Sequence, residues 1–264
     1  MSVPVVYVGA ERAFRLADLA TGTEHVTGSM PTGPWLADRH GTPLLGALGV
    51  LVDDVLGYSL VRARPDRLWS VSSEITVDLL RPLRLDAGPL HATTVGEQRF
   101  DELGGQVAGT VAAADGTVVT VCAQRGRWVP FDGEFAVRDA PPVDLSGATC
   151  VEDLLGGEPE SVEGGSRLRL AVGPVLANPL GNLHGGLSLC ATDLAASAAV
   201  TTWDTPWSTE SIRIQYLRPA PAGATVEFRA VVRHTGRTRA LVEVAGLVGD
   251  RLCTAAHVVG RPFT

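Results

Sequence analysis

The sequence has little of what marks a disulfide-rich or metal-binding protein. It contains four cysteines, Cys122, Cys150, Cys190 and Cys253, which lie far apart and form no C-x-x-C pair. We therefore expect free, buried thiols rather than disulfides or a metal site. The six histidines show no ligand-like spacing either. No structural metal is expected.

The sequence also lacks a block of positive charge, a targeting signal and long uninterrupted apolar runs. The net charge is -7 and no block of Lys or Arg occurs, which argues against nucleic-acid or anionic-membrane partners. The N-terminal segment has charged residues by position 12 and lacks the basic and apolar regions of a secretion signal. Acidic residues interrupt the two most apolar stretches, 43–63 and 187–203, so neither predicts a membrane span. We expect a globular, cytoplasmic protein.

The chain contains an internal repeat. Residues 33–53 align with residues 173–193 at a constant offset of 140, and seven of the 21 positions are identical. The identical residues of the first copy are Gly33, Pro34, Leu36, Ala37, Gly41, Gly46 and Asp53. Most of them fix backbone geometry or chemistry rather than fill a core. A duplication is the simplest explanation.

The two copies also agree further along the chain. The segment 75–82 resembles 212–219, and Ala87-Gly88 corresponds to Ala222-Gly223, with the offset reduced to 137 and then 135. Short deletions in loops account for this drift. We predict an N-terminal domain at 1–130, a linker at 131–160 rich in Gly, Pro and acidic residues, and a C-terminal domain at 161–264.

Each copy follows the same order of elements: a short extended segment, one long helix and several strands. The helices, expected at about 44–61 and 184–202, are apolar nearly all round, so each must be buried. The strands that follow are rich in β-branched residues and separated by turn residues. The expected fold class is α+β, with an antiparallel sheet wrapped around a central helix in each copy.

The most informative segment of the sequence begins the second helix. It places Asn178 before His184-Gly185-Gly186, with Asp193 seven residues after the second glycine. Two glycines at the start of a buried helix leave the first backbone N–H groups accessible, which favours a negative charge there. Such a donor can stabilise the oxyanion of an acyl-transfer reaction.

This pattern, Asn-x5-His-Gly-Gly-x6-Asp followed by a strand ending Tyr-Leu-Arg-Pro-Ala, resembles the hotdog-fold acyl-CoA thioesterases of the phenylacetate-degradation (PaaI-like) type. The resemblance covers nearly all of both copies. It implies a tandem double hotdog that forms a pseudo-dimer. It also implies that the active site lies between the two hotdogs, where the His-Gly-Gly loop of one faces the helix carboxylate of the other.

The first copy has a degenerate version of this loop. Leu44 and Leu45 stand where the second copy has His184 and Gly185, and Asp38 replaces the asparagine. We therefore expect one functional site, which joins the loop of the second copy to a carboxylate of the first.

The resemblance assigns roles to individual residues. Asp53 would activate water or attack directly, and the Gly185 N–H would polarise the thioester carbonyl. Asn178 and Ser72 would position the water, and His184 would orient the thioester or the loop. The expected substrate-binding residues are Gly186, Arg237 and Arg239, and the degenerate half-site holds Asp193 and Thr209. The two arginines belong to a basic turn that could meet coenzyme A phosphates, although a solvated turn is the alternative.

Other interpretations of these residues stay open. Asp53, Asp193 and His184 could each be structural, and Asp54 is expected to face elsewhere as a solvated or salt-bridged charge. Ser188 lacks a nucleophile elbow around it.

The function also has alternatives. Besides thioester hydrolysis, the chain could be a non-catalytic acyl-CoA-binding protein or an enoyl-thioester hydratase. The carrier could be coenzyme A or acyl carrier protein. No cofactor is expected, because coenzyme A would enter only as part of the substrate. Two pseudo-dimers could pair further into a homodimer.

Overall fold

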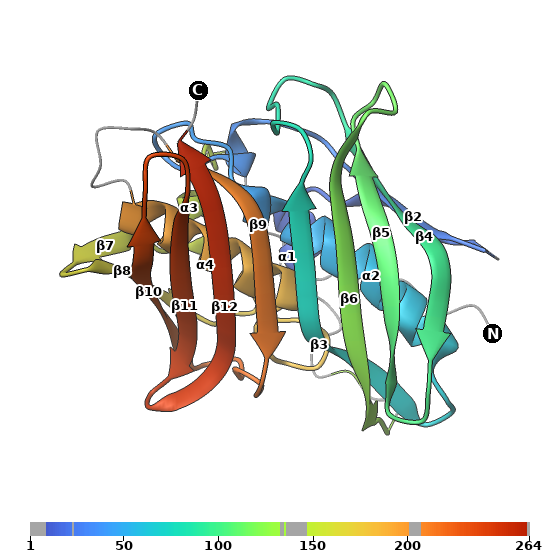
Figure 1. The fold of residues 1–264 in the computed structure, drawn as a ribbon. Helices are drawn as coiled ribbons and strands as arrows, with labels where there is room; N and C mark the ends of the chain where they lie inside the picture. Colours follow the sequence, from blue (N-terminus) through green and yellow to red (C-terminus); the bar gives the residue numbers. More distant parts are fainter. Residues whose placement is uncertain (1–8, 23, 133–134, 136–146, 201–206, 263–264) are drawn as a thin grey trace.

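One antiparallel sheet forms the framework of the molecule (Figure 1). The computed structural model describes residues 9–22, 24–132, 135, 147–200 and 207–262. The sheet has 12 strands in the order β1-β2-β4-β5-β6-β3-β9-β12-β11-β10-β8-β7. The strands of its first half are β1 (Ala17–Thr21), β2 (Val26–Met30), β3 (Leu68–Leu79), β4 (Leu90–Phe100), β5 (Gly104–Ala112) and β6 (Val118–Pro130). Those of the second half are β7 (Pro159–Val162), β8 (Gly165–Ala171), β9 (Trp207–Tyr216), β10 (Thr225–Thr235), β11 (Ala240–Val248) and β12 (Arg251–Pro262).

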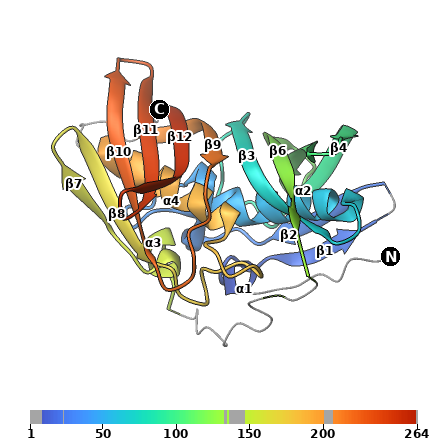
Figure 2. The ribbon, with the colours of Figure 1, turned by 90° about the horizontal axis from the view of Figure 1, so that it is seen from below.

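Two long helices lie against one face of this sheet. Helix α2 (Gly49–Ala63) packs on the first half and α4 (Gly185–Val200) on the second, and Figure 2 shows each half of the sheet curving around its helix. A 3-10 turn, η2 (Leu45–Leu48), leads into α2. Most side chains of both helices are buried, as expected for helices that are apolar nearly all round. The predicted antiparallel sheet around long buried helices is confirmed.

The two halves of the sheet have the same internal order, running outward from a shared seam. From the centre, β3-β6-β5-β4-β2-β1 matches β9-β12-β11-β10-β8-β7. At the seam, β3 pairs antiparallel with β9, and Thr76 lies opposite Arg213. These two residues are equivalent in the sequence repeat. On either side of them Ile75 pairs with Ile214 and Val77 with Ile212, so equivalent residues exchange partners across the seam.

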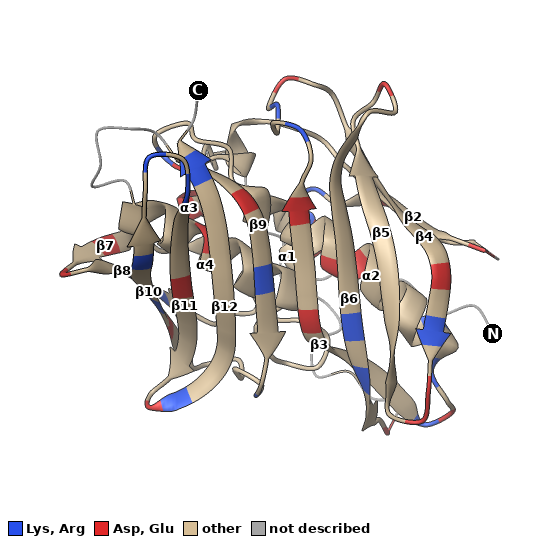
Figure 3. Cartoon of the chain, in the orientation of Figure 1, with Lys and Arg blue, Asp and Glu red and all other residues tan. Residues whose placement is uncertain are grey.

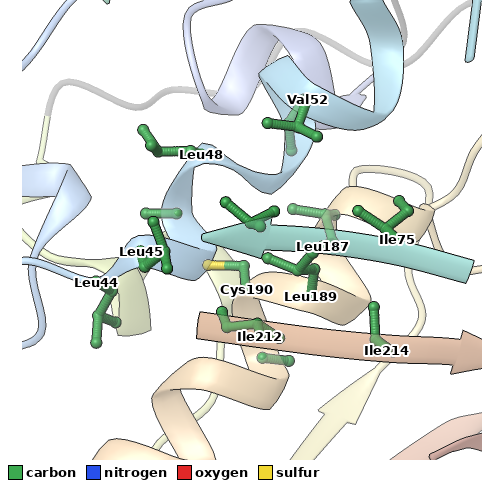
Figure 4. Close-up of a cluster of buried hydrophobic side chains, with 14 of the residues drawn as sticks. Leu44, Leu45, Leu48, Val52, Ile75, Leu187, Leu189, Cys190, Ile212 and Ile214 are labelled. Atoms are coloured by element: carbon green, nitrogen blue, oxygen red, sulfur yellow. The ribbon is translucent and has the colours of Figure 1, made fainter. Parts of the chain in front are cut away.

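Apolar side chains fill the space between the helices and the seam (Figure 4). Leu48 and Val52 of the first half meet Leu187 and Cys190 of the second, and all four are buried completely. Because this cluster draws on both halves, the halves share one core. All four cysteines of the chain are free and buried, as predicted.

The segment predicted to be a linker is partly built into the fold. Its described part holds helix α3 (Val151–Leu155) and strand β7, and β7 pairs with β8. The Val151 N–H donates to the Ala37 carbonyl oxygen at 2.8 Å. The linker prediction from composition therefore missed two elements, which are too short to show a hydrophobic period.

Charge is mixed over the strands rather than gathered into one block (Figure 3). Arg169 and Arg229 both contact Glu227, and Arg233 contacts Glu243. In the part of the chain that the structure describes, no helix is long and apolar enough to cross a membrane.

Candidate active site

The two long helices approach each other closely near their N-terminal ends, and glycine makes this possible. A Cβ on Gly186 would lie 2.4 Å from the Gly49 carbonyl oxygen, and one on Gly185 would lie 2.6 Å from Asp53 Oδ2. Both distances are shorter than real Cβ contacts, so any side chain here would push the helices or the carboxylate away. The Gly-Gly pair thus brings the start of α4 onto the Asp53 side chain of α2.

Asp53 is held by donors from both halves of the chain. Its Oδ2 accepts a hydrogen bond from the Gly186 N–H at 2.9 Å. Its Oδ1 accepts one from the Ser72 hydroxyl at 2.8 Å and one from Gln124 Nε2 at 3.0 Å. Gln124 also donates to the Ser72 hydroxyl oxygen at 2.8 Å. Both carboxylate oxygens are therefore fixed in orientation before any substrate enters.

His184 lies between three carboxylates. Its Nδ1 is 3.4 Å from Asp53 Oδ2, and its Nε2 is 3.5 Å from Asp54 Oδ1 and 4.0 Å from Glu11 Oε1. Burial alone would lower the pKa of His184, but the neighbouring Asp54, with Asp53 and Glu11, raises it to about 10. Burial also raises the pKa of Asp54. The imidazole and the Asp54 carboxyl thus hold a proton between them at neutral pH.

These groups open onto a cavity of about 430 Å³ between the two halves. Asp53, Ser72, Gln124, His184 and Gly185 all line it. The rest of the wall is largely apolar and comes from both halves, including Tyr58, Val61, Trp69, Val129, Leu180, Leu183 and Leu217. The cavity thus combines an apolar chamber with a small cluster of fixed polar groups, the usual make-up of a small-molecule site.

Gly185 is the first residue of α4, so its N–H has no acceptor within the helix. Its carbonyl oxygen accepts a hydrogen bond from the Tyr216 hydroxyl at 2.7 Å. Tyr216 is part of the Tyr-Leu-Arg-Pro segment and also lines the cavity. The Tyr216 side chain therefore fixes the Gly185–Gly186 peptide, whose N–H donates to Asp53, directly after the Gly185 N–H that is the predicted oxyanion donor.

Asn178 lines the cavity, but its side-chain oxygen forms hydrogen bonds within its own loop. Oδ1 accepts hydrogen bonds from the N–H groups of Leu180 and Asn182, at 3.0 and 3.1 Å. Asp38 holds the corresponding loop of the first half in the same way, through His40 and Thr42. The Asx turn, shared by both halves, shows that Asn178 stabilises its loop. Its side-chain NH2 group is left for the predicted role of positioning the water.

The second half-site keeps the Asp53 arrangement, but the described residues around its carboxylate are buried. Asp193 Oδ2 accepts from the Gly46 N–H at 2.7 Å, and Oδ1 accepts from the Thr209 hydroxyl at 2.6 Å. The Asp193 side chain is fully buried. Burial raises its pKa to about 6, although the two hydrogen bonds oppose the shift.

Apolar residues replace the polar groups around this second carboxylate. Leu44 and Leu45, in the positions of His184 and Gly185, are 1% and 2% exposed. Val258 pairs with Ile212 as Gln124 pairs with Ile75, so Val258 takes the place of Gln124. By the same register Trp207 takes the place of Ser70, and its indole N–H donates to the Thr209 hydroxyl at 3.1 Å.

Three residues expected to bind substrate do not meet the cavity. The Gly186 N–H is engaged by Asp53, and Gly186 is not part of the cavity wall. Arg237 and Arg239 line a separate hollow with Glu210, to which Arg239 donates at 3.2 Å. Their turn joins β10 to β11 on the side of the second half-site. Because the fold directs the two arginines to the second half-site, this cavity gives no support to their predicted contact with the substrate, which stays a prediction.

The sequence did not predict several polar residues of the cavity wall. Asp54, a reserve candidate expected to face elsewhere as a solvated or salt-bridged charge, does pair with His184, but it is 7% exposed and this pair lies in the cavity wall. Glu11, Gln124 and Arg218 also line the cavity. Arg218 is the one arginine among the described lining residues. Its place in the repeated Leu-Arg-Pro segment was the available signal.

Comparisons with known proteins show what this chain is similar to. A sequence model described as the thioesterase superfamily matches residues 180–255, the part that carries the His-Gly-Gly loop. The chain has the hotdog fold of the thioesterases. A search of curated proteins found no match.

Solved hotdog structures similar to this chain span nearly its whole length. A tesB protein from Mycobacterium avium subsp. paratuberculosis has a TM-score of 0.65 at 12% identity and covers 97% of this chain and 98% of its own. The 12:0-ACP thioesterase from Umbellularia californica has a TM-score of 0.59 at 10% identity, covering 90% and 94%. The acyl-CoA thioesterase II TesB2 from Mycobacterium marinum has a TM-score of 0.57 at 16% identity, covering 96% of each chain. At these identities the likeness concerns the fold.

Proposed function

We propose that this chain hydrolyses an acyl thioester, acyl-CoA or acyl-ACP, to a free acid and a thiol at a single site between its two halves. The observation that carries the proposal is the Asp53 carboxylate on the cavity wall, held by Gly186, Ser72 and Gln124 beside the start of α4. The match of the thioesterase superfamily model to 180–255 supports it.

The geometry supports a simple hydrolytic sequence. The thioester carbonyl oxygen lies against the Gly185 N–H at the positive end of α4. Asp53 takes a proton from a water molecule as the water oxygen bonds to the carbonyl carbon. The tetrahedral intermediate then collapses, the C–S bond breaks, and the proton passes to the departing thiolate.

Direct attack by Asp53 on the carbonyl carbon is the alternative to base catalysis. The C–S bond would break with release of the thiolate, leaving a mixed anhydride between the acyl group and Asp53, which water then hydrolyses to the free acid and the Asp53 carboxylate. A single turnover in ¹⁸O-water separates the two. Direct attack incorporates the label into the Asp53 carboxylate when water opens the anhydride there, whereas base catalysis places it only in the product acid.

We further propose that the molecule is a tandem double hotdog produced by duplication, a pseudo-dimer whose domains are 1–130 and 161–264. The mirrored strand order, the Thr76–Arg213 pair at the seam and the Asp53 and Asp193 arrangements support this. Among the described residues, polar groups line the cavity at one half-site, whereas leucine, valine and tryptophan take the corresponding positions at the other.

The substrate's acyl group fits the apolar part of the cavity, where Tyr58, Val61 and Trp69 lie. Arg218 is exposed and lines the same cavity, so it can pair with a phosphate of the carrier. We therefore propose Arg218, rather than Arg237 or Arg239, as the arginine that contacts the carrier.

A panel of acyl-CoA thioesters of increasing chain length tests the proposal. Thiol release is followed with a thiol reagent, and binding is measured by calorimetry on the same samples. We expect thiol and free acid in equal amounts. Tight binding without thiol would instead indicate an acyl-CoA-binding protein, and loss of enoyl absorbance without thiol would indicate a hydratase.

A further inference from the structure

Two hydrogen bonds meet on the first peptide group of α4. The Tyr216 hydroxyl donates to the Gly185 carbonyl oxygen at 2.7 Å, and the Gly186 N–H donates to Asp53 Oδ2 at 2.9 Å. This carbonyl and this N–H belong to the same amide. The phenol of the second half is therefore joined to the carboxylate of the first through a single peptide bond, and the hydrolytic sequence proposed above does not use it.

The peptide bond transmits the effect of one hydrogen bond to the other. Its C–N bond has partial double-bond character, so a donor on the carbonyl oxygen withdraws electrons from the nitrogen and makes the N–H a stronger donor. Hydrogen bonds linked in this way strengthen one another by about 10–30% each. The acceptor here is a carboxylate, and hydrogen bonds to its ionised form favour that form. Tyr216 therefore favours the ionised Asp53, which is the form that can take a proton from water.

The Tyr216 phenol stays a donor throughout the pH range in which a carboxylate titrates. Burial raises the pKa of Tyr216 well above its ordinary value, and the negative charge of Asp53 adds to the shift. Tyr216 also lines the cavity together with Asp53 and Gly185. Its hydroxyl is thus protonated, and held on the Gly185 carbonyl, whenever Asp53 gains or loses a proton.

The other half of the chain shows that the fold does not need this hydroxyl. Tyr216 corresponds in the repeat to Leu79, which packs against the core. The equivalent hydrogen bond from Gly46 to Asp193 still forms there. The tyrosine is therefore an addition on the cavity side rather than a requirement of the contact between the two helices.

Other titratable groups also act on Asp53. The Nδ1 atom of His184 lies 3.4 Å from Asp53 Oδ2 and 3.1 Å from the Gly186 nitrogen. Asp54 of α2 and Glu11 of α1 (Gly9–Ala13) face the other nitrogen of this imidazole. Removal of the Tyr216 hydroxyl leaves all of these groups in place, so a changed pH dependence would report the phenol alone.

We propose that Tyr216 is a positioning residue for thioester hydrolysis: through the Gly185–Gly186 peptide it strengthens the hydrogen bond that keeps Asp53 ionised and oriented. The inference rests on the proposed function for its effect on the rate, whereas its effect on Asp53 is a property of the folded protein itself. Without the hydroxyl, Asp53 binds a proton more readily, so activity is lost first at acidic pH.

Tyr216→Phe tests the proposal, because it removes the hydroxyl and keeps the ring. We expect kcat/KM near pH 7 to fall about threefold to tenfold, the effect of one lost hydrogen bond. The acidic limb of its pH profile should move to higher pH by about half a unit. Thr209→Val is the matched control, since it removes a hydroxyl that donates to Asp193 in the other half, and it should change neither. An unshifted acidic limb in Tyr216→Phe would overturn the proposal even if the rate fell.

Nuclear magnetic resonance tests the same hydrogen bond without substrate. In Tyr216→Phe the Gly186 amide proton should move upfield, since a weaker hydrogen bond leaves it more shielded. The ¹³C-labelled carboxyl of Asp53, assigned with Asp53→Asn, should titrate at a higher pH than in the wild type. Unmoved Gly186 and Asp53 signals would contradict the inference. Both shifts, found with a wild type that releases no thiol, would support the inference and contradict the proposed function alone.

Discussion

The Gly186 N–H donates to Asp53 Oδ2 at 2.9 Å, and the two residues belong to opposite halves of the chain. The same bond occurs at the other half-site, from Gly46 to Asp193 at 2.7 Å. The repeat has thus preserved one interaction twice. Around it, Gln124 and His184 line a cavity at the first half-site, whereas Val258 and Leu44 occupy their positions at the second. The predictions below depend on this asymmetry.

A methyl group on Gly185 should damage the site while sparing the fold. The Cβ of Gly185→Ala would lie 2.6 Å from Asp53 Oδ2, displacing the carboxylate from the oxyanion donor. We expect hydrolysis to fall by about 10² or more, with a far-UV circular dichroism spectrum like that of the wild type. Gly173→Ala is the matched control, because a Cβ there meets open space. Similar losses in the two variants would show that the close approach to Asp53 is unimportant.

Substitution of Gln124 should lower the rate of hydrolysis, because Gln124 is a hydrogen-bond donor to Asp53 that has no counterpart at the degenerate half-site. Gln124→Val copies Val258 of the other half and removes one of the two donors to Asp53 Oδ1. The loss of one hydrogen bond to a charged group corresponds to roughly tenfold or more in kcat. Val258→Ala, which alters the corresponding position across the seam, should leave kcat unchanged. An unaltered kcat in Gln124→Val would show that the hydrogen bond from Gln124 to Asp53 does not contribute to hydrolysis.

Asp193 should make stability depend on pH. Burial raises its pKa to about 6 from an ordinary value of 3.8, so the folded protein binds more protons than the unfolded chain between these values. The free energy of unfolding should therefore decrease as the pH rises from about 4 to about 6, by roughly 3 kcal/mol at most. Urea unfolding across this range measures it.

Asp193→Asn should flatten that dependence, because it removes the titrating group. Asp250→Asn changes an exposed aspartate and should leave the slope as it is. If Asp193→Asn and the wild type lost stability in parallel over this range, another buried group would be responsible.

Much of the fold follows from local patterns in the sequence. The two long helices are apolar nearly all round, and the longer strands carry β-branched residues between clear turns, so both were predicted near their observed bounds. The short edge strands β1 and β7 were missed. Their side chains are mostly exposed or half-buried, and a four- or five-residue strand without a buried face leaves no period to detect.

The candidate site was predictable from the His-Gly-Gly segment, from the family that it resembles and from comparison of the two copies. The repeat pointed to Asp53 and to the intact loop, and the structure brings Asp53, Ser72, His184 and Gly185 together. It could not place Glu11, because that residue lies outside the repeated segments and reaches the cavity through tertiary packing alone. The further pairing of two chains into a homodimer stays a prediction.

The most direct test of the account is the rate of thiol release by Asp53→Asn and Asp193→Asn, measured side by side on the best substrate of the wild type. The two aspartates occupy equivalent positions, each beside the N–H of an equivalent glycine. We predict that Asp53→Asn lowers kcat by at least about 10², while Asp193→Asn keeps most of the activity. Equal losses, or full activity in Asp53→Asn, would contradict a single site built on Asp53.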